Sequence, residues 1–221
     1  MKILTLSGNI EVLTGLHIGG SDDTMKIGGV DNGVIKVYDR ELKREVPYIP
    51  GSSLKGKIRS LLEWNFGVAQ LNGGKPFGSD VLKQYENTHL KDKKQELENF
   101  LKLFGDSSSD NEFGMTRAIF SDCFLVDKEN IDEIREVKTE NIVNRGKGKA
   151  KYPRQTERVA PGVEFGFEIR VKVLDGDDEE KMKKIIEKGL KLLELDYLGG
   201  NGSRGYGRVK IHYKDWKNEA I

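Results

Sequence analysis

The chain has 221 residues, of which 36% are hydrophobic and 33% charged, values that are ordinary for a globular protein and sufficient for one compact domain. Its 37 Lys and Arg nearly balance its 36 Asp and Glu, so the net charge of +1 neither indicates nor excludes a nucleic-acid partner. The single cysteine, Cys123, excludes an intrachain disulfide and a cysteine-based zinc cluster. No signal-peptide pattern or membrane-length apolar run is found, so we expect a soluble, cytoplasmic protein without a membrane partner.

The first predicted elements are a strand and a helix. From Lys2 to about Thr14, apolar and polar residues alternate with the period of a half-buried strand. After Pro50, leucine and isoleucine recur at helical spacing, and the hydroxyl of Ser52 or Ser53 is placed to cap the first turn.

The rest of the chain predicts an insertion and then a second set of elements. The segment from about 65 to 114 is polar and contains one helical piece, "KKQELENFLKLFG". Strands are expected at 117–127 and 163–173, where apolar residues alternate, and a helix at 175–195, where acidic residues in the first turn suit the helix dipole. The stretch "RVKIHY" at 208–213 predicts a closing strand.

This order of strand, helix, strand, then strand, helix, strand is typical of the split βαβ, ferredoxin-like pattern that RRM domains share. We therefore expect an α+β fold in one domain over residues 1–221, with long excursions between elements.

Glycine is concentrated in two segments, with six residues from Gly15 to Gly33 and five from Gly199 to Gly207. Because glycine allows positive φ and close approach of a ligand to the backbone, these segments are candidates for a binding surface. The alternative is that both are only tight turns.

The loop "GGNGSRGYG" formally matches a dinucleotide fingerprint, but a helix precedes it and a strand follows it, so we expect no nucleotide cofactor. It also resembles the RNA-contacting motif of RRM domains, in which only Tyr206 could stack on a base. We prefer a third interpretation, in which Ser203, Arg204 and exposed amides bind an RNA backbone through its phosphates.

The segments "GLHIGG", "GGVDNGVI", "YIPGSSLKGKIRSLLE", "PRQTERV" and "LKLLELDYLGGNGSRGYGRV" together resemble the RAMP superfamily of CRISPR systems, specifically the backbone subunits of type III-A effector complexes, the family of the third Csm subunit. The resemblance implies copies stacked helically along a guide RNA, other Csm subunits as partners, and metal-dependent cleavage of complementary single-stranded target RNA at regular intervals. It also implies that the insertion at about 65–114 is a lid. Several members of that family carry Cys and His zinc ligands in this insertion, whereas this chain offers only His89 there, so we expect no zinc.

The start of the predicted helix after Pro50 is a candidate phosphate site. Ser52, Ser53, Lys55, Lys57 and Arg59 would combine hydroxyls, helix N-terminal amides and cations, and the resemblance favours this interpretation. The alternative is a surface helix with ordinary solvated lysines.

Two further segments complete the expected RNA surface. His17 in "GLHIGG" is a candidate guide-RNA contact, and a structural histidine is an equal alternative. The segment from Lys138 to Arg158 contains seven basic residues, among them Arg145 and Arg154, and only two acidic residues. This run is either a solvated loop or, as the resemblance implies, the thumb hairpin of the family at about 138–160.

Asp31 in "GGVDNGV" matches the family position where an aspartate is needed for target cleavage. Its carboxylate would bind Mg²⁺ or another divalent cation, or activate a 2′-hydroxyl for attack on the adjacent phosphate. Asn32-Gly33 is also a hairpin-turn signal, so Asp31 is equally interpretable as a turn former.

The expected function is therefore a guide-RNA-organised endoribonuclease subunit. One alternative is a non-catalytic RNA-binding scaffold whose partner performs the cleavage. A remoter alternative is a free RRM-like RNA chaperone, which the large insertion and the basic segment disfavour.

Overall fold

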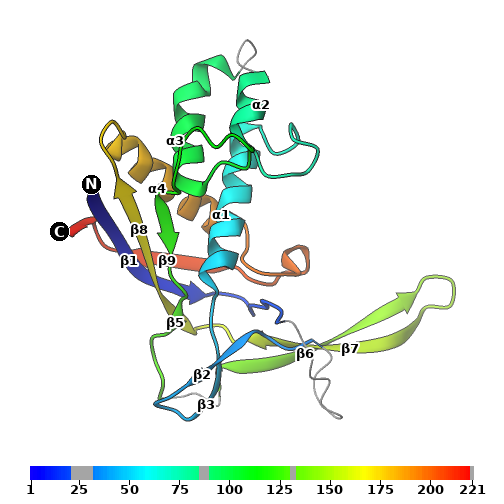
Figure 1. Cartoon of the computed structure of the whole chain (residues 1–221). Coiled ribbons are helices and arrows are strands. Elements are labelled where there is room, and N and C mark those ends of the chain that lie inside the picture. Colours follow the sequence, from blue (N-terminus) through cyan, green and yellow to red (C-terminus); the bar gives the residue numbers. More distant parts are fainter. Residues whose placement is uncertain (21–31, 85–89, 130–132, 220–221) are drawn as a thin grey trace.

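The structure is a computed structural model that describes residues 1–20, 32–84, 90–129 and 133–219. Its central element is an antiparallel sheet built from segments far apart in the sequence (Figure 1). The strands of this sheet are β1 (Lys2–Val12), β4 (Ala118–Phe120), β5 (Phe124–Leu125), β8 (Glu164–Val173), β9 (Val209–Tyr213) and β10 (Lys217–Glu219). Strand β1 is central, with β8 on one side and β9 and β10 on the other, and β4 and β5 pair with β8.

Two long helices pack against this sheet, α1 (Gly51–Phe66) and α4 (Glu179–Leu195). Alternate residues of β1, such as Leu4, Leu6 and Ile10, are buried in the same core as the apolar stripes of both helices. At Gly189 of α4 an added Cβ would lie 2.5 Å from a methyl of Ile58, so glycine permits the close approach of the helices. The predicted strands and helices of the two halves of the chain are thus confirmed as a mixed fold with antiparallel sheets.

Two local predictions were wrong. No side-chain hydroxyl caps α1: its N-cap is Pro50, and the first amide, that of Gly51, donates instead to the carboxylate of Asp122 at 2.8 Å. The strand expected at 117–127 is split into β4 and β5, because Cys123 between them exchanges backbone hydrogen bonds with Ile49 at 2.8 and 3.0 Å.

The insertion contains more helix than the sequence suggested. It forms α2 (Ser79–Gln84), the short 3₁₀ turn η1 (Lys91–Lys93) and α3 (Lys94–Phe104). A chain of aromatic contacts joins α3 to the core, with ring centroids 5.5 Å apart for Phe66 and Phe100 and 5.9 Å apart for Phe104 and Phe120. The insertion is therefore a packed part of the molecule. His89 lies outside the described residues.

Two hairpins extend the fold below the main sheet as drawn in Figure 1. One is β2 (Lys36–Asp39) with β3 (Arg44–Pro47), which the sequence did not predict. The other is β6 (Arg135–Asn144) with β7 (Lys149–Val159), which occupies the basic segment and projects away from the core. At its base Val159 pairs with Leu16, and Thr156 pairs with Asn32. Asp31, which precedes Asn32 in the chain, lies outside the described residues.

Candidate functional site

The two glycine-rich segments meet in space. The amide of Gly200 donates to the carbonyl of His17 at 2.8 Å, and that of Gly207 donates to Gly15 at 3.1 Å. Gly199 has a φ of +75°, and an added Cβ there would lie 2.3 Å from the His17 carbonyl oxygen. Glycine is therefore required for this contact. The sequence proposed both segments as binding candidates but gave no sign that they touch.

The outer side of this glycine loop carries its polar residues. The loop contains the 3₁₀ turn η2 (Gly202–Arg204), and both Ser203 and Arg204 are exposed. Gly202 lies against the ring of Tyr197, because an added Cβ would be 2.1 Å from ring carbons. Lys57 of α1 also lies over that ring, with its Nζ 3.7 Å from the ring centroid. Tyr197, which sequence reasoning missed, thus connects α1 to the glycine loop.

Tyr206 is not a platform for stacked bases. Its side chain is fully buried, and two cations lie close to its ring: Lys138 Nζ is 4.5 Å from the centroid, and the Arg158 guanidinium is 4.7 Å from it. Its hydroxyl donates to Glu140 Oε1 at 3.2 Å. The RRM-type stacking considered from the sequence is therefore excluded at this residue, and Tyr206 instead joins the glycine loop to the base of the β6–β7 hairpin.

The cations at the start of α1 do not form one exposed cluster. Lys57 is paired with Asp196 at 2.7 Å. Arg59 is turned inward, donating to Glu63 at 2.9 Å and to the carbonyl oxygens of Phe77 and Phe104 at 2.8 and 3.2 Å. Arg59 is therefore occupied by acceptors within the protein, and its expected contact with phosphate stays a prediction.

Lys55 and the two serines remain at the helix start as the sequence placed them. Lys55 is half-buried, and its desolvation, with the nearby Arg59, lowers its pKa below the ordinary value for a lysine. Ser52 is exposed and Ser53 is half-buried, on the first turn of α1 where the helix dipole favours anions.

His17 has a structural contact. Its Nδ1 lies 2.8 Å from the carbonyl oxygen of Glu157, so this nitrogen donates and the ring orientation is fixed by β7. The ring is only partly buried. The interpretation of His17 as a structural histidine is thus supported by a specific hydrogen bond to Glu157. Its contact with guide RNA stays a prediction.

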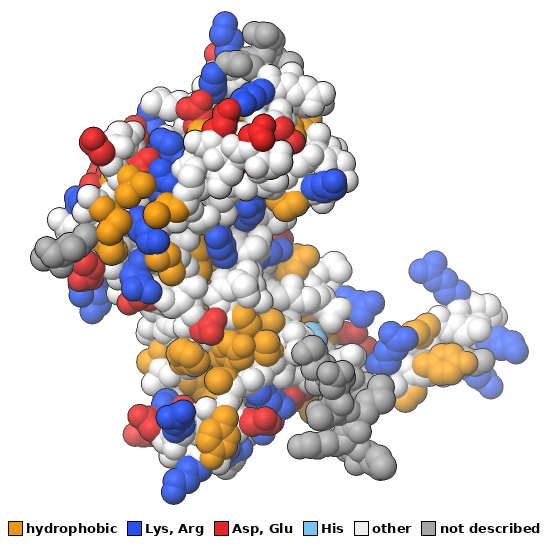
Figure 2. Space-filling view, in the orientation of Figure 1, with side chains coloured by type: hydrophobic (Ala, Val, Ile, Leu, Met, Phe, Trp, Pro, Cys, Tyr) orange, Lys and Arg blue, Asp and Glu red, His pale blue; other side chains and the backbone are white. Residues whose placement is uncertain are grey.

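The β6–β7 hairpin carries exposed cations along its length. Arg145 and Arg154 are both exposed, and Figure 2 shows Lys and Arg side chains gathered on this projection. Apolar side chains are exposed among them, with Ile142 52%, Val143 58% and Tyr152 71% accessible. A basic surface with apolar and aromatic groups suits a nucleic acid better than an acidic protein partner.

Asn32, which follows Asp31 in the chain, is anchored to this hairpin. Its carbonyl accepts from the Glu157 amide at 2.9 Å, and its amide donates to Gln155 at 3.3 Å. The segment after Asp31 therefore begins at the base of the hairpin, next to His17 and the glycine loop.

Glu157 is the buried carboxylate of this region, and sequence reasoning missed it. It accepts from the Val34 amide at 3.0 Å and pairs with Lys36 at 2.9 Å and Arg135 at 3.0 Å. Burial raises its pKa, but the hydrogen bonds from Lys36 and Val34 outweigh burial, so the pKa lies below the ordinary value for a glutamate. Glu157 is thus a structural anion rather than a free base.

The described residues contain no group of three or more His, Cys, Asp and Glu side chains able to hold a metal ion. In the same part of the chain, no helix is long and apolar enough to cross a bilayer.

Comparison with known proteins gives concordant results. Residues 9–210 match the model of the RAMP superfamily. The chain is 42% identical over 211 residues to the CRISPR system Cms endoribonuclease Csm3 of Methanocaldococcus jannaschii, covering 93% of this chain and 77% of that protein. It is 42% identical over 216 residues to the protein of the same name from Streptococcus thermophilus, covering 93% of this chain and 86% of the relative.

Solved structures agree. A chain in the crystal structure of the Csm3–Csm4 subcomplex of the type III-A CRISPR-Cas interference complex matches with a TM-score of 0.52 at 30% identity, covering 98% of this chain and 78% of that one. A chain in the type III-B Cmr-beta complex bound to cognate target RNA shares the fold, with a TM-score of 0.56 at 19% identity, covering 98% of this chain and 61% of that one. This chain therefore belongs to the RAMP superfamily and, within it, to the Csm3 family.

Proposed function

We propose that this chain is the backbone subunit of a type III-A CRISPR ribonucleoprotein, which binds guide RNA and cleaves complementary single-stranded target RNA at regular intervals. The observation that carries the proposal is a convergence: the glycine loop, the His17 turn and the basic hairpin meet beside Asn32, the residue that follows Asp31 in the chain. Relatives named as endoribonucleases support the same conclusion.

The parts of the molecule take the following roles in this proposal. The strand order β9–β1–β8–β4, with α1 and α4 between strands, supports a ferredoxin-like core in a single domain. The β6–β7 hairpin is the thumb that interrupts the guide and target duplex, and the helical insertion is the lid. Copies of the chain stack along the guide RNA with other Csm subunits in the cytoplasm.

Guide RNA is held mainly through its phosphates. Ser203, Arg204 and the amides of the glycine loop form one contact, and Ser52, Ser53 and Lys55 at the start of α1 form a second, connected to the loop through Lys57 and Tyr197. Because phosphate contacts carry no base information, one surface can serve any guide sequence.

Asp31 is the proposed catalytic residue. Its carboxylate takes a proton from the 2′-hydroxyl of a splayed nucleotide, whose oxygen attacks the adjacent phosphorus as the bond to the 5′-oxygen of the next nucleotide breaks. The alternative role, as a ligand of a divalent cation, is compatible with the described residues: Mg²⁺ held by one carboxylate and RNA phosphates needs no three-residue cluster, and it would stabilise the developing charge.

The decisive experiment uses the assembled complex. Asp31→Asn and Asp31→Ala should lower the rate of target cleavage by about 10²-fold or more, while target affinity stays nearly unchanged, because one carboxylate contributes little to a mainly electrostatic interface. Asp23→Asn, which removes a carboxylate from the same sequence segment, is the matched control and should cut normally.

The scaffold alternative makes the opposite prediction. If Asp31→Asn cuts at the wild-type rate and Asp31→Ala only lowers the melting temperature, Asp31 is a turn former and cleavage belongs to a partner subunit.

A further inference from the structure

The carboxylate of Glu140 lies at the contact between the glycine loop and the hairpin. Glu140 of β6 is paired with Lys138 Nζ at 3.1 Å and with Arg204 Nη1 at 3.2 Å, and it accepts from the Tyr206 hydroxyl at 3.2 Å. Two cations and one hydroxyl from two separate elements therefore converge on the same anion.

These donors form the kind of site that binds phosphate. Lysine, arginine and tyrosine hydroxyls are common phosphate ligands, and a carboxylate is the closest side-chain equivalent of a phosphate oxygen pair. Lys138 has a second contact, because its ammonium also lies over the buried Tyr206 ring, and the Arg158 guanidinium lies 4.7 Å from the centroid of the same ring. One of the two cations is therefore held in place before any ligand arrives.

The anion is also replaceable. The side chains of Glu140, Lys138 and Arg204 are 25%, 35% and 63% exposed, so solvent and an RNA strand can reach all three. By contrast, Glu157 at the hairpin base is 9% exposed and holds a backbone amide as well. The Lys138 ammonium, together with the Tyr206 hydroxyl, keeps the pKa of Glu140 below its ordinary value, so it is charged at neutral pH.

We propose that Glu140 is an internal competitor for RNA: it occupies a phosphate site formed by Lys138, Arg204 and the Tyr206 hydroxyl, and an RNA phosphate displaces it on binding. The inference rests on the proposed RNA-binding function and adds to it a specific site and its resting occupant. In the absence of RNA, the Arg204 guanidinium is neutralised by Glu140. An RNA phosphate must replace this carboxylate, so short or poorly placed strands bind more weakly.

Displacement also has a structural consequence. Glu140 belongs to β6, and its contacts with Arg204 and Tyr206 hold the hairpin to the glycine loop. When RNA occupies the site, the direct contact of Glu140 with Arg204 and Tyr206 is replaced by a contact through the RNA phosphate. This exchange occurs at the base of the hairpin, which also anchors Asn32.

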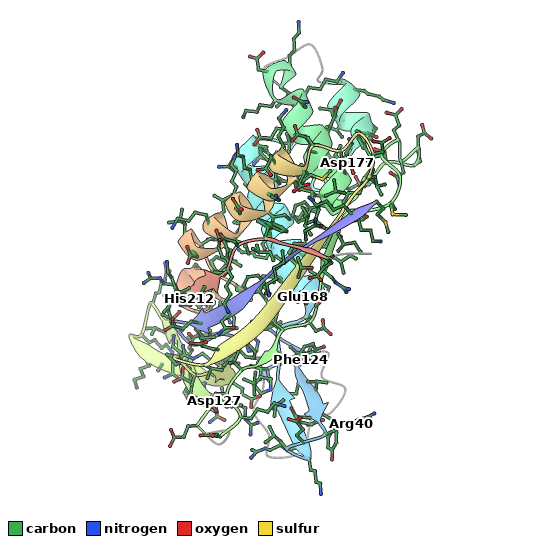
Figure 3. The ribbon with its side chains drawn as sticks, turned by 90° about the vertical axis from the view of Figure 1, so that its left-hand side faces the viewer. Arg40, Phe124, Asp127, Glu168, Asp177 and His212 are labelled. Atoms are coloured by element: carbon green, nitrogen blue, oxygen red, sulfur yellow. The ribbon has the colours of Figure 1, made fainter. Side chains whose placement is uncertain are left out.

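The test compares two variants with the same change in net charge. Glu140→Gln removes the competing charge, whereas Glu168→Gln removes a carboxylate on β8, in the middle of the sheet, where it pairs with Arg170 at 3.3 Å (Figure 3). The probe is a fluorescent oligouridylate, titrated with the full-length protein over a series of salt concentrations.

Glu140→Gln should bind about five-fold more tightly at low salt, and its salt slope should be steeper by about 0.7, the value for one additional phosphate contact on a single strand. Glu168→Gln should change affinity less than two-fold, roughly the general effect of one distant charge. Adding Arg204→Ala to Glu140→Gln should abolish the gain. Glu140→Ala also removes the competing charge and should show the same gain in affinity as Glu140→Gln.

The outcomes separate the two proposals. If the wild type binds the oligonucleotide but both Glu140 variants bind equally or more weakly with an unchanged slope, the competitor inference is wrong and the RNA-binding function stands. If Glu140→Gln still binds RNA more tightly when Arg204→Ala is added, Arg204 is not part of the phosphate site and the proposed site is wrong. If the wild type binds no RNA alone or in its complex, the proposed function itself fails.

Discussion

The helical insertion and the β6–β7 hairpin are both excursions from one core, but they are held to it in opposite ways (Figure 1). The insertion buries aromatic rings against α1 and β4. It is also fixed by Asp177, which is 2% exposed and paired with Arg117 at 3.0 Å and Lys102 at 3.2 Å. The hairpin has no comparable apolar anchor beyond its base among the described residues, and its strands are largely exposed.

This difference indicates that the two excursions have different roles, the insertion in stability and the hairpin in binding. Apolar burial stabilises a fold regardless of ligand, whereas exposed strands joined to the core by charges keep those charges available to a partner. We therefore expect the insertion to behave as part of the folding unit and the hairpin to respond to RNA.

The largest expected effect is in the insertion. Phe100 is fully buried between Phe66 and Phe104, so Phe100→Ala should lower the free energy of unfolding by about 4 kcal/mol. Phe124→Ala removes a ring that is 52% exposed and should cost roughly 1 kcal/mol or less. Urea denaturation of both variants measures this, and equal losses would show that the insertion is not packed as described.

The second prediction concerns the buried ion group. Asp177→Asn leaves Arg117 and Lys102 without a counterion and should cost about 3 kcal/mol. Glu112→Gln breaks the exposed pair with Lys83 in the same insertion and should cost roughly 0.5 kcal/mol or less.

Asp177 also predicts a dependence on pH. Burial raises its pKa, but hydrogen bonds from Arg117, the Leu174 amide and Lys102 lower it overall. A lowered folded-state pKa contributes stability that is complete above the unfolded-state value of about 3.9 and is lost as the pH falls through the folded-state value. The stability difference between wild type and Asp177→Asn should therefore narrow below about pH 4, and a constant difference would argue against the ionised pair.

The third prediction concerns the hairpin. Its tip, with Arg145 and Lys147 exposed, should be the first site of tryptic cleavage in the free protein, while α3 stays intact. Guide RNA should slow this cleavage about five-fold, since opening of the hairpin is suppressed when RNA binds it. Mass spectrometry of timed digests identifies the fragments. Should RNA leave the cleavage rate unaltered, the thumb assignment is wrong.

The smallest expected effect on stability is in the same hairpin. Arg145→Ala combined with Arg154→Ala should change the unfolding free energy by about 0.5 kcal/mol or less. The salt slope of RNA binding should nevertheless fall by about 0.7 for each lost phosphate contact. Arg40→Ala combined with Lys43→Ala, two exposed cations of the β2–β3 turn, is the control (Figure 3 labels Arg40). An equal fall in the control would mean that only net charge matters.

The sequence predicted the parts of the fold that depend on local periodicity. The alternation in β8 and the apolar stripe of α4 are long and regular, and both were located correctly. The β2–β3 hairpin was missed, because four-residue strands are too short to show a period. The insertion was underestimated, because its apolar residues are spaced among many lysines and glutamates.

The candidate site was predicted in composition but not in arrangement. Motif residues such as Arg204 and His17 could be named from their neighbours in the sequence. The residues with which they form ion pairs or hydrogen bonds could not. Glu140 and Arg204 are 64 residues apart, and His17 and Glu157 are 140 apart. Pairing at such separations is decided by the tertiary fold, which single-sequence patterns do not encode.

The central position of β1 bears on how the protein is made. Its hydrogen-bonding partners are β8 on one side and β9 and β10 on the other, and the contact between Glu11 and His212 spans 201 residues. Folds dominated by such distant pairings have high contact order and fold slowly. During synthesis at about 5–20 residues per second, β1 emerges many seconds before either neighbour and must wait with both edges unpaired. A ribosome-bound chain halted before β9 should therefore engage chaperones, and release of the last strand should end that engagement.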